Sequence, residues 1–317
     1  MADQGSKLIS IVVPFYNEEA GIELFYATLT AQLQTIPAYT FEVVCVDDGS
    51  KDATLERLKL LVERDNRFVV LELSRNFGKE AAMSAGLDAA QGDAAIPMDA
   101  DLQDPPELIG RMLKEWASGY EVVLAKRTDR SSDTLLKRKT AAMFYKVHNR
   151  FSSVKLPENV GDYRLIDRVV LEALQQLPEQ QRFMKGLFAW VGYRTVTISY
   201  QRQPRSAGES KFSGWKLWNF ALEGITSFSI APLKIWTYLG AVGALASLAY
   251  ALFIGLRTLF LGNDVPGYPS LFVAIVFFGS VQLIGIGVLG EYIGRTYMES
   301  KRRPLYFVRK RYQNEPK

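Results

Sequence analysis

Two long runs of apolar residues near the end of the chain constrain its fold more than any other feature. The runs cover residues 235–256 and 270–290, and neither contains a charged side chain. Each has roughly the 20 residues that a helix needs to cross the hydrocarbon core of a bilayer. The segment between them is short and contains glycine and proline. The two runs therefore predict a helical hairpin across a membrane rather than two buried helices of a soluble domain.

The basic residues around this hairpin predict its orientation. The connecting segment carries only Arg257, which Asp264 balances, and Lys234 precedes the first run. The basic residues that follow the second run include Arg295, Lys301, Arg302, Arg303, Arg309, Lys310 and Arg311. Positive charge marks the cytoplasmic side of a membrane protein, so we expect a multi-pass membrane protein with both termini and the large domain in the cytoplasm. The partly strand-like pattern of the tail, "RPLYFVRKRY", favours its return to the large domain over a free end.

The composition agrees with one soluble part and one apolar part. Hydrophobic residues make up 48% of the 317 residues and charged residues 23%. The formal net charge of +4 is mild, so charge does not argue for a nucleic-acid partner. "MADQGSKLIS" has no apolar run before the first strand, and we expect no signal peptide.

The first 130 residues or so alternate short apolar runs with helical patterns. Five runs have the length and composition of buried strands: "LISIVVPFY", "FEVVCVDDGS", "RFVVLELS", "DAAIPMDAD" and "YEVVLAKR". The clearest helix between them covers Thr54–Arg64, and Ser50 or Asp52 can cap its start. This order predicts an α/β fold with a mostly parallel sheet and helices on both faces.

Polar clusters follow four of these strands: "PFYNEE", "DDGS", "SRNFGK" and "DADLQD". Ligands of parallel α/β sheets bind at the carboxyl ends of the strands, so we expect a functional site there. The chain has neither G-x-G-x-x-G after its first strand nor a P-loop motif, which argues against a dinucleotide-binding or P-loop protein.

The segment "DADLQDPPE" concentrates carboxylates that repel one another unless a cation lies among them. The candidate cations are a metal ion and a basic side chain, with plain water as a third possibility. The chain contains one histidine and one cysteine, so a metal would need oxygen ligands. Asp99, Asp101 and Gln103 stand on alternate positions and, with substrate phosphates, would suit Mg²⁺ or Mn²⁺. In the alternative, a solvated turn, Asp104 caps a helix that begins at Pro105.

The motif order resembles that of the polyprenyl-phosphate glycosyltransferases, which are inverting family 2 enzymes of the GT-A fold. The resemblance rests on "VVPFYNEE", "VDDGSKD", "SRNFGKEAAMSAG", "DADLQDPPE", "GDYRLID" and "RSAGESKF" and covers essentially the whole chain. The C-terminal runs match the bactoprenol (undecaprenyl-phosphate) glucosyltransferase branch well, and dolichyl-phosphate mannose synthases are related.

The resemblance implies roles for individual residues. Nucleotide-sugar-binding positions are Pro14, Tyr16, Asn17, Glu18, Asp47, Asp48 and Asp99. Asp99, Asp101 and Gln103 match the metal site, and Arg127, Arg138 and Ser210 match positions near the acceptor phosphate, although surface arginines are usually plain solvated charges. Arg205, Ser210 and Lys211 match a loop that closes near the diphosphate. Asp162 matches a proposed base, but a lipid phosphate is already anionic, so a positioning role is at least as well supported. The catalytic candidates are thus Asp162, Asp101, Arg205 and Lys211.

The expected reaction is transfer of a sugar, most simply glucose from UDP-glucose, to undecaprenyl phosphate with inversion. The alternatives are another nucleotide sugar, a processive polysaccharide synthase, which "QQRFMKG" only partly resembles, and a non-catalytic membrane scaffold. We expect a GT-A catalytic domain in residues 1–213, an interfacial amphipathic helix in 214–232, the hairpin in 233–292 and a basic tail in 293–317. A core helix of a second small domain is the other interpretation of 214–232. Glycines in the two runs favour helix packing and a homo-oligomer.

Overall fold

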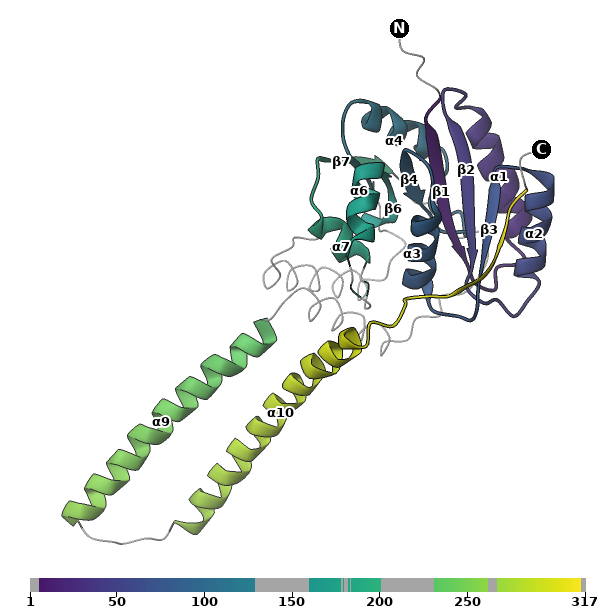
Figure 1. The fold of residues 1–317 in the computed structure, drawn as a ribbon. Coiled ribbons are helices and arrows are strands. Elements are labelled where there is room, and N and C mark those ends of the chain that lie inside the picture. Colours follow the sequence, from purple (N-terminus) through teal and green to yellow (C-terminus); the bar gives the residue numbers. More distant parts are fainter. Residues whose placement is uncertain are drawn as a thin grey trace.

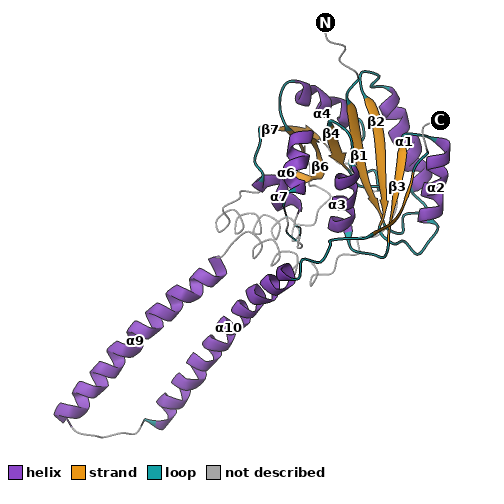
Figure 2. Cartoon of the chain, viewed as in Figure 1, coloured by secondary structure: helices purple, strands orange, loops and turns teal. Residues whose placement is uncertain are grey.

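The computed structural model describes residues 6–128, 160–177, 179, 182, 184–200, 231–261 and 267–314. Within these residues, one α/β domain holds both ends of the described chain, and two long helices lead away from it (Figure 1). The sheet-and-helix part is compact around a single sheet, as the colouring by secondary structure makes clear (Figure 2).

Eight strands of the described chain form one sheet in the order β7-β5-β6-β4-β1-β2-β3-β8. Their bounds are β1 Leu8–Phe15, β2 Thr40–Asp47, β3 Phe68–Leu73, β4 Ala94–Pro97, β5 Val122–Arg127, β6 Val160–Asp167, β7 Thr195–Tyr200 and β8 Val308–Tyr312. The pairs among β1, β2, β3 and β4 are parallel, as is β5 with β7, whereas β6 and β8 run antiparallel to their neighbours. The predicted α/β fold with a mostly parallel sheet is confirmed.

Helices cover both faces of the sheet. Buried side chains of α1 (Ile22–Gln34), α2 (Thr54–Arg64) and α4 (Leu108–Ala117) belong to one apolar cluster. Those of α3 (Lys79–Ala89), α6 (Arg168–Gln175) and α7 (Met184–Trp190) belong to a second cluster. The five predicted strands and the helix from Thr54 to Arg64 all lie where the sequence pattern put them.

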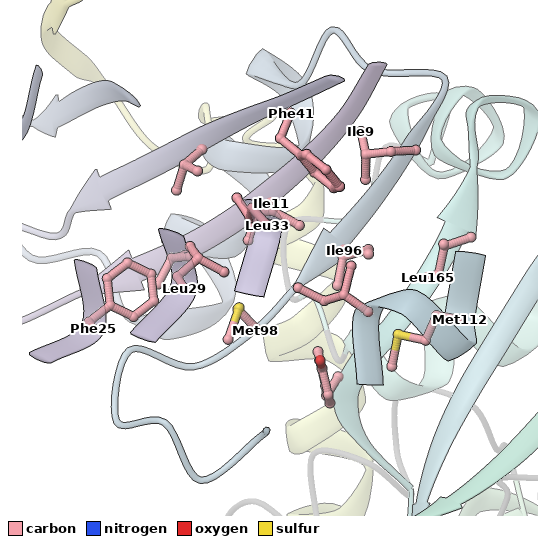
Figure 3. Close-up of a cluster of buried hydrophobic side chains, with 14 of the residues drawn as sticks. Ile9, Ile11, Phe25, Leu29, Leu33, Phe41, Ile96, Met98, Met112 and Leu165 are labelled. Atoms are coloured by element: carbon pink, nitrogen blue, oxygen red, sulfur yellow. The ribbon is translucent and has the colours of Figure 1, made fainter. Parts of the chain in front are cut away.

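Successive side chains of β1 point to opposite faces of the sheet, so this one strand contributes to both apolar clusters. Ile9 and Ile11 face the first cluster with Phe25 of α1 (Figure 3). Val12 of the same strand faces the second cluster. Full burial of one such side chain stabilises the fold by roughly 1.5–3 kcal/mol. On the second face, a Cβ added to Gly86 of α3 would lie 2.4 Å from Val12 Cγ1. Only glycine allows α3 to approach the sheet this closely, and the approach fixes where the start of α3 meets the strand ends.

The two apolar runs form long helices, α9 (Ala231–Leu261) and α10 (Tyr268–Ser300), which extend from the same side of the domain (Figure 1). They touch where Trp236 lies 3.2 Å from the position of a Cβ on Gly285. Within the described residues, one segment, Ala274–Ser300 of α10, is by length and composition suited to crossing a membrane. The predicted span over residues 235–256, in α9, and the predicted homo-oligomer stay predictions. Residues 214–230, most of the predicted interfacial helix, lie outside the described residues.

The tail after α10 returns to the domain, as its pattern favoured. Strand β8 pairs antiparallel with β3 at the edge of the sheet. The Tyr312 hydroxyl donates to Glu72 Oε2 at 2.7 Å, and an Arg309 guanidinium nitrogen lies 3.2 Å from Glu72 Oε1. Nearer α10, Tyr306 donates to Asp88 of α3 at 2.7 Å. The long helix is therefore tied at its C-terminal end to the sheet and to α3.

Candidate active site

The loops after β1 and β2 are joined by hydrogen bonds between backbone and side chains. Asn17 N–H donates to Ser50 Oγ at 3.0 Å, and Lys51 N–H donates to Asn17 Oδ1 at 2.8 Å. Glu18 N–H donates to Thr54 Oγ1 at 2.9 Å. Asn17 has φ of +53°, a conformation that asparagine tolerates better than most residues. Two of the four predicted clusters thus form one preorganised wall, beside which Tyr16 is 42% exposed.

Asp47 and Asp48 end β2 and have different surroundings. Asp48, 3% exposed, accepts from Phe77 N–H at 2.7 Å and Gly78 N–H at 3.0 Å, so its carboxylate fixes the backbone before α3. Asp47 accepts from Ser50 N–H through Oδ2, while no donor among the described residues reaches its buried Oδ1. Burial raises the pKa of both carboxyls. Asp47 therefore has an oxygen that a ligand N–H could reach. The Asp48 carboxylate instead holds the backbone of the loop before α3.

The third and fourth clusters meet through Lys79, the first residue of α3. Its Nζ lies 2.6 Å from Asp99 Oδ1, just after β4, and 3.3 Å from Asp162 Oδ2 on β6. Strands β4 and β6 are antiparallel neighbours, which brings the two aspartates together. The basic side chain among the acids is therefore Lys79, which sequence analysis did not single out although "SRNFGK" contained it.

This lysine and its neighbours keep Asp162 ionised. Burial disfavours the charge of Asp162, but Lys79, Lys185 and Arg164 outweigh burial and hold the pKa of its carboxyl below the usual range. For Lys79, burial acts against the ammonium, but Asp99 and Asp162 raise its pKa overall. A carboxylate with a lowered pKa is a weak base. The electrostatics thus favour a positioning role for Asp162 over proton abstraction.

Asp101 and Gln103 lie in the turn after β4, where Gln103 N–H donates to Asp101 Oδ1 at 3.1 Å. Between them, Leu102 has φ of +55°, which turns the chain sharply. Gln103 is 4% exposed. The turn therefore keeps the three predicted metal ligands, Asp99, Asp101 and Gln103, within one short stretch.

Asp104 does not cap a helix at Pro105, the alternative that the sequence left open. Helix α4 begins at Leu108, and Asp104, 3% exposed, accepts from the Tyr200 hydroxyl at 2.8 Å. Arg127 donates through Nε to Tyr200 Oη at 3.1 Å and lies 3.7 Å from Asp104 Oδ1. Burial and then Asp104 raise the pKa of Tyr200 to about 12. Arg127, which the sequence predicted to bind the acceptor phosphate, thus contacts Tyr200 of β7 and Asp104 in the turn after β4.

Two further charged residues lie behind Asp162. The Arg164 guanidinium is buried 4.1 Å from the Phe188 ring centre and donates to the carbonyl of Gly161. Burial lowers its pKa to about 10. Burial and the nearby Asp162 charge raise the pKa of Glu80 to about 7. Neither residue carried a signal in the sequence, because their surroundings come from β6, α3 and α7, which are far apart along the chain.

The acidic turn fits a divalent cation that a substrate helps to bind. Within the described residues, no group of three or more His, Cys, Asp or Glu side chains could hold a metal by itself. Mg²⁺ and Mn²⁺ sites of nucleotide enzymes commonly use one or two carboxylates plus substrate phosphates, and Asp99 and Asp101 provide two carboxylates. The ammonium of Lys79 already stands 2.6 Å from Asp99 Oδ1, so this oxygen accepts a cation in the fold as it stands.

The remaining predicted site residues lie outside the described residues. They are Arg138 in 129–159 and Arg205, Ser210 and Lys211 in 201–230. Their assignment to the acceptor phosphate and to a closing loop stays a prediction.

The fold is that of an α/β domain with a candidate site at the strand ends, and comparison with known proteins identifies the family. Residues 10–175 match the model of Glycosyl transferase family 2. The chain belongs to this family and is a glycosyltransferase, as the motif resemblance predicted.

Relatives match nearly the whole chain. A bactoprenol glucosyl transferase of Shigella phage SfV is 55% identical, with 95% of this chain and 98% of the relative aligned. A prophage-derived bactoprenol glucosyl transferase of Shigella flexneri is 54% identical over 97% and 99% of the two chains. An uncharacterized glycosyltransferase of Synechocystis is 56% identical over 95% and 94%.

Among solved structures, the chain is similar to a mannosyltransferase of Pyrobaculum calidifontis in complex with GDP-Man and Mn²⁺. The identity is 17% and the TM-score 0.44, with 95% of this chain and 86% of that chain covered.

Proposed function

We propose that the protein transfers glucose from UDP-glucose to the phosphate of undecaprenyl phosphate, with inversion at the anomeric carbon. The observation that carries the proposal is the identity of 54–55% over 95% or more of the chain to bactoprenol glucosyl transferases. Because the identity includes the C-terminal apolar helices, it supports a lipid acceptor as well as a sugar donor.

The joined β1 and β2 loops would bind the nucleoside. Asp47 Oδ1 is buried and has no donor among the described residues, which is costly unless a ligand supplies one. An N–H at the edge of a nucleobase would satisfy it, and the exposed Tyr16 ring could lie against the base. Pro14, Asn17 and Glu18 then shape the same wall.

The diphosphate would lie at the acidic turn and at Lys79. Asp99, Asp101 and Gln103 would hold Mg²⁺ or Mn²⁺, which when bound neutralises charge on the departing diphosphate. A phosphate oxygen of the lipid attacks the anomeric carbon as the bond from that carbon to the donor's β-phosphate oxygen breaks. The electron pair leaves with UDP. Attack opposite the leaving group converts an α-linked donor into a β-linked product.

Asp162 would orient the reacting groups rather than remove a proton. The acceptor phosphate is anionic at neutral pH and carries a ready nucleophile. Lys79, 3.3 Å from Asp162, holds that carboxylate ionised beside the expected position of the sugar. The arginines proposed for the acceptor, Arg127 and Arg138, would offset the repulsion between this carboxylate and the incoming phosphate.

The membrane part would bring the acceptor to this site. Helix α10 and, as we propose, α9 span the inner membrane, with residues 1–213 and the tail on the cytoplasmic side. Large apolar side chains along α10 are exposed in the single chain: Leu271, Ile275, Phe277, Leu283, Ile284, Ile286 and Ile293. Lipid would cover such a surface at little cost, whereas water would not.

The test uses the full chain in detergent with undecaprenyl phosphate, Mg²⁺ or Mn²⁺, and a panel of radiolabelled nucleotide sugars. We expect label in the organic phase from UDP-glucose, lost with EDTA and in Asp101→Ala. Lys114→Met, an exposed change on α4, serves as the matched control and should keep activity. Label from another donor would change the sugar assignment. No organic-phase label from any donor, in folded protein, would overturn the proposal in favour of the synthase or scaffold alternatives.

A further inference from the structure

The Lys79 ammonium joins two carboxylates from separate parts of the chain. Its Nζ is 2.6 Å from Asp99 Oδ1 and 3.3 Å from Asp162 Oδ2. The Lys79 side chain is 46% exposed, whereas those of Asp99 and Asp162 are 30% and 16% exposed. The lysine therefore lies on the solvent side of the two acids and balances charges that would otherwise repel each other across the β4–β6 pair.

The backbone that carries Lys79 is fixed, so only its side chain has freedom. The Asp48 carboxylate accepts from the two N–H groups just before it, those of Phe77 and Gly78. About two helical turns further on, Gly86 packs directly against Val12 of the sheet. A half-exposed lysine side chain on a rigid base has four rotatable bonds with which to move its charge between neighbours.

The position of this charge matters because Asp99 Oδ1 is also a proposed metal ligand. A divalent cation bound directly to that oxygen cannot share it with an ammonium at 2.6 Å without strong repulsion. Asp162 Oδ1 has no donor among the described residues, so an ammonium that leaves Asp99 has an oxygen to move toward.

We propose that Lys79 is a positioning residue that occupies the cation position at Asp99 in the empty site. It gives up Asp99 when the metal arrives with the nucleotide and stays on Asp162. This inference rests on the metal-dependent site of the proposed function and goes beyond it. Its consequence is ordered binding: metal alone competes with the lysine, whereas metal carried by a diphosphate displaces it.

The test measures Mn²⁺ binding to the full chain in detergent, without nucleotide, by the electron paramagnetic resonance signal of free Mn²⁺. Lys79→Met removes the competing charge at nearly constant size, and we expect Mn²⁺ to bind about fivefold more tightly, the effect of losing one partly exposed ion pair. Lys79→Gln keeps hydrogen-bond donors without charge and should behave like Lys79→Met. Lys79→Arg should restore the affinity of the unchanged chain, and Lys114→Met, which removes an exposed charge elsewhere, should leave it unchanged.

Equal or weaker Mn²⁺ binding by both uncharged variants overturns the inference, as does the absence of detectable Mn²⁺ binding in all proteins. A purely structural lysine would lower the melting temperature without tightening metal binding. The measurement needs neither donor nor lipid, so it is separate from the transfer assay. If the unchanged chain transfers sugar but the Lys79 variants bind Mn²⁺ no more tightly, only the inference about Lys79 is wrong. If the variants bind Mn²⁺ more tightly but the unchanged chain transfers no sugar, only the proposed function is wrong.

Discussion

Asp48 offers a quantitative test of how the candidate site is held in place. Its carboxylate accepts hydrogen bonds from the backbone N–H groups of Phe77 and Gly78, which an alanine at this position would remove. Hydrogen bonds to a charged group contribute roughly 1.5–3 kcal/mol each. Against this, burial raises the pKa of Asp48, so its removal also relieves a buried charge. We therefore expect Asp48→Ala to destabilise the loop before α3 by about 2–4 kcal/mol, and Asp48→Asn, which keeps one acceptor, by about half as much.

The assay is hydrogen exchange read by mass spectrometry on peptides that contain Phe77 and Gly78. A local loss of about 2–4 kcal/mol corresponds to exchange faster by roughly thirtyfold to several hundredfold. Glu63→Ala, which removes an exposed carboxylate from α2, is the control and should leave these peptides unchanged. Unchanged exchange of Phe77 and Gly78 in Asp48→Ala would refute the assignment of Asp48 to the loop.

Three further predictions concern charge, backbone and the tail. The folded pKa of Glu80, about 7, is above its unfolded value of 4.5, so native protein holds the proton more tightly and stability falls as pH rises through this range. The melting temperature of Glu80→Gln should therefore fall less between pH 5 and pH 8 than that of the unchanged chain. Equal falls would contradict the raised pKa of Glu80. Gly49→Ala adds a Cβ 2.6 Å from Asn76 N at φ of +65°, so the variant should unfold at a markedly lower temperature, and an unchanged midpoint would contradict the close approach. Tyr312→Phe removes the bond to Glu72 and should cost about 1 kcal/mol, seen as faster proteolysis of the tail; equal rates would contradict its role.

Local patterns in the sequence predicted the first half of the sheet well. Buried parallel strands have continuous apolar runs in the sequence, and the polar clusters that follow them predicted the edge of the sheet where the candidate site lies. The tail could be predicted to return because "YFVRKRY" has strand character, but its place beside β3 could not. That register depends on Glu72, which lies 240 positions away from Tyr312.

The sequence predicted the acidic residues of the candidate site, but it did not predict which side chains contact them. Asp99, Asp101 and Asp162 stand in recognisable motifs. The role of Lys79 appears only in the folded chain, where β6 lies beside β4 and brings Asp162, 83 positions further along the sequence, to the lysine. Asp104 before two prolines has the pattern of a helix cap. In the structure its carboxylate instead accepts a hydrogen bond from the Tyr200 hydroxyl, 96 positions away. Long-range pairing decides such contacts, and one sequence contains no local signal for it.

The structure of the reaction product tests the proposed transfer most directly. We would transfer sugar to undecaprenyl phosphate, isolate the lipid and determine its linkage and anomeric configuration by ¹H and ³¹P nuclear magnetic resonance. Inverting transfer to a lipid phosphate predicts one sugar joined through a phosphodiester to the lipid, with the β configuration from an α-linked donor. An α-linked product, a chain of several sugars, or free sugar from hydrolysis of the donor would contradict inverting transfer to a lipid phosphate.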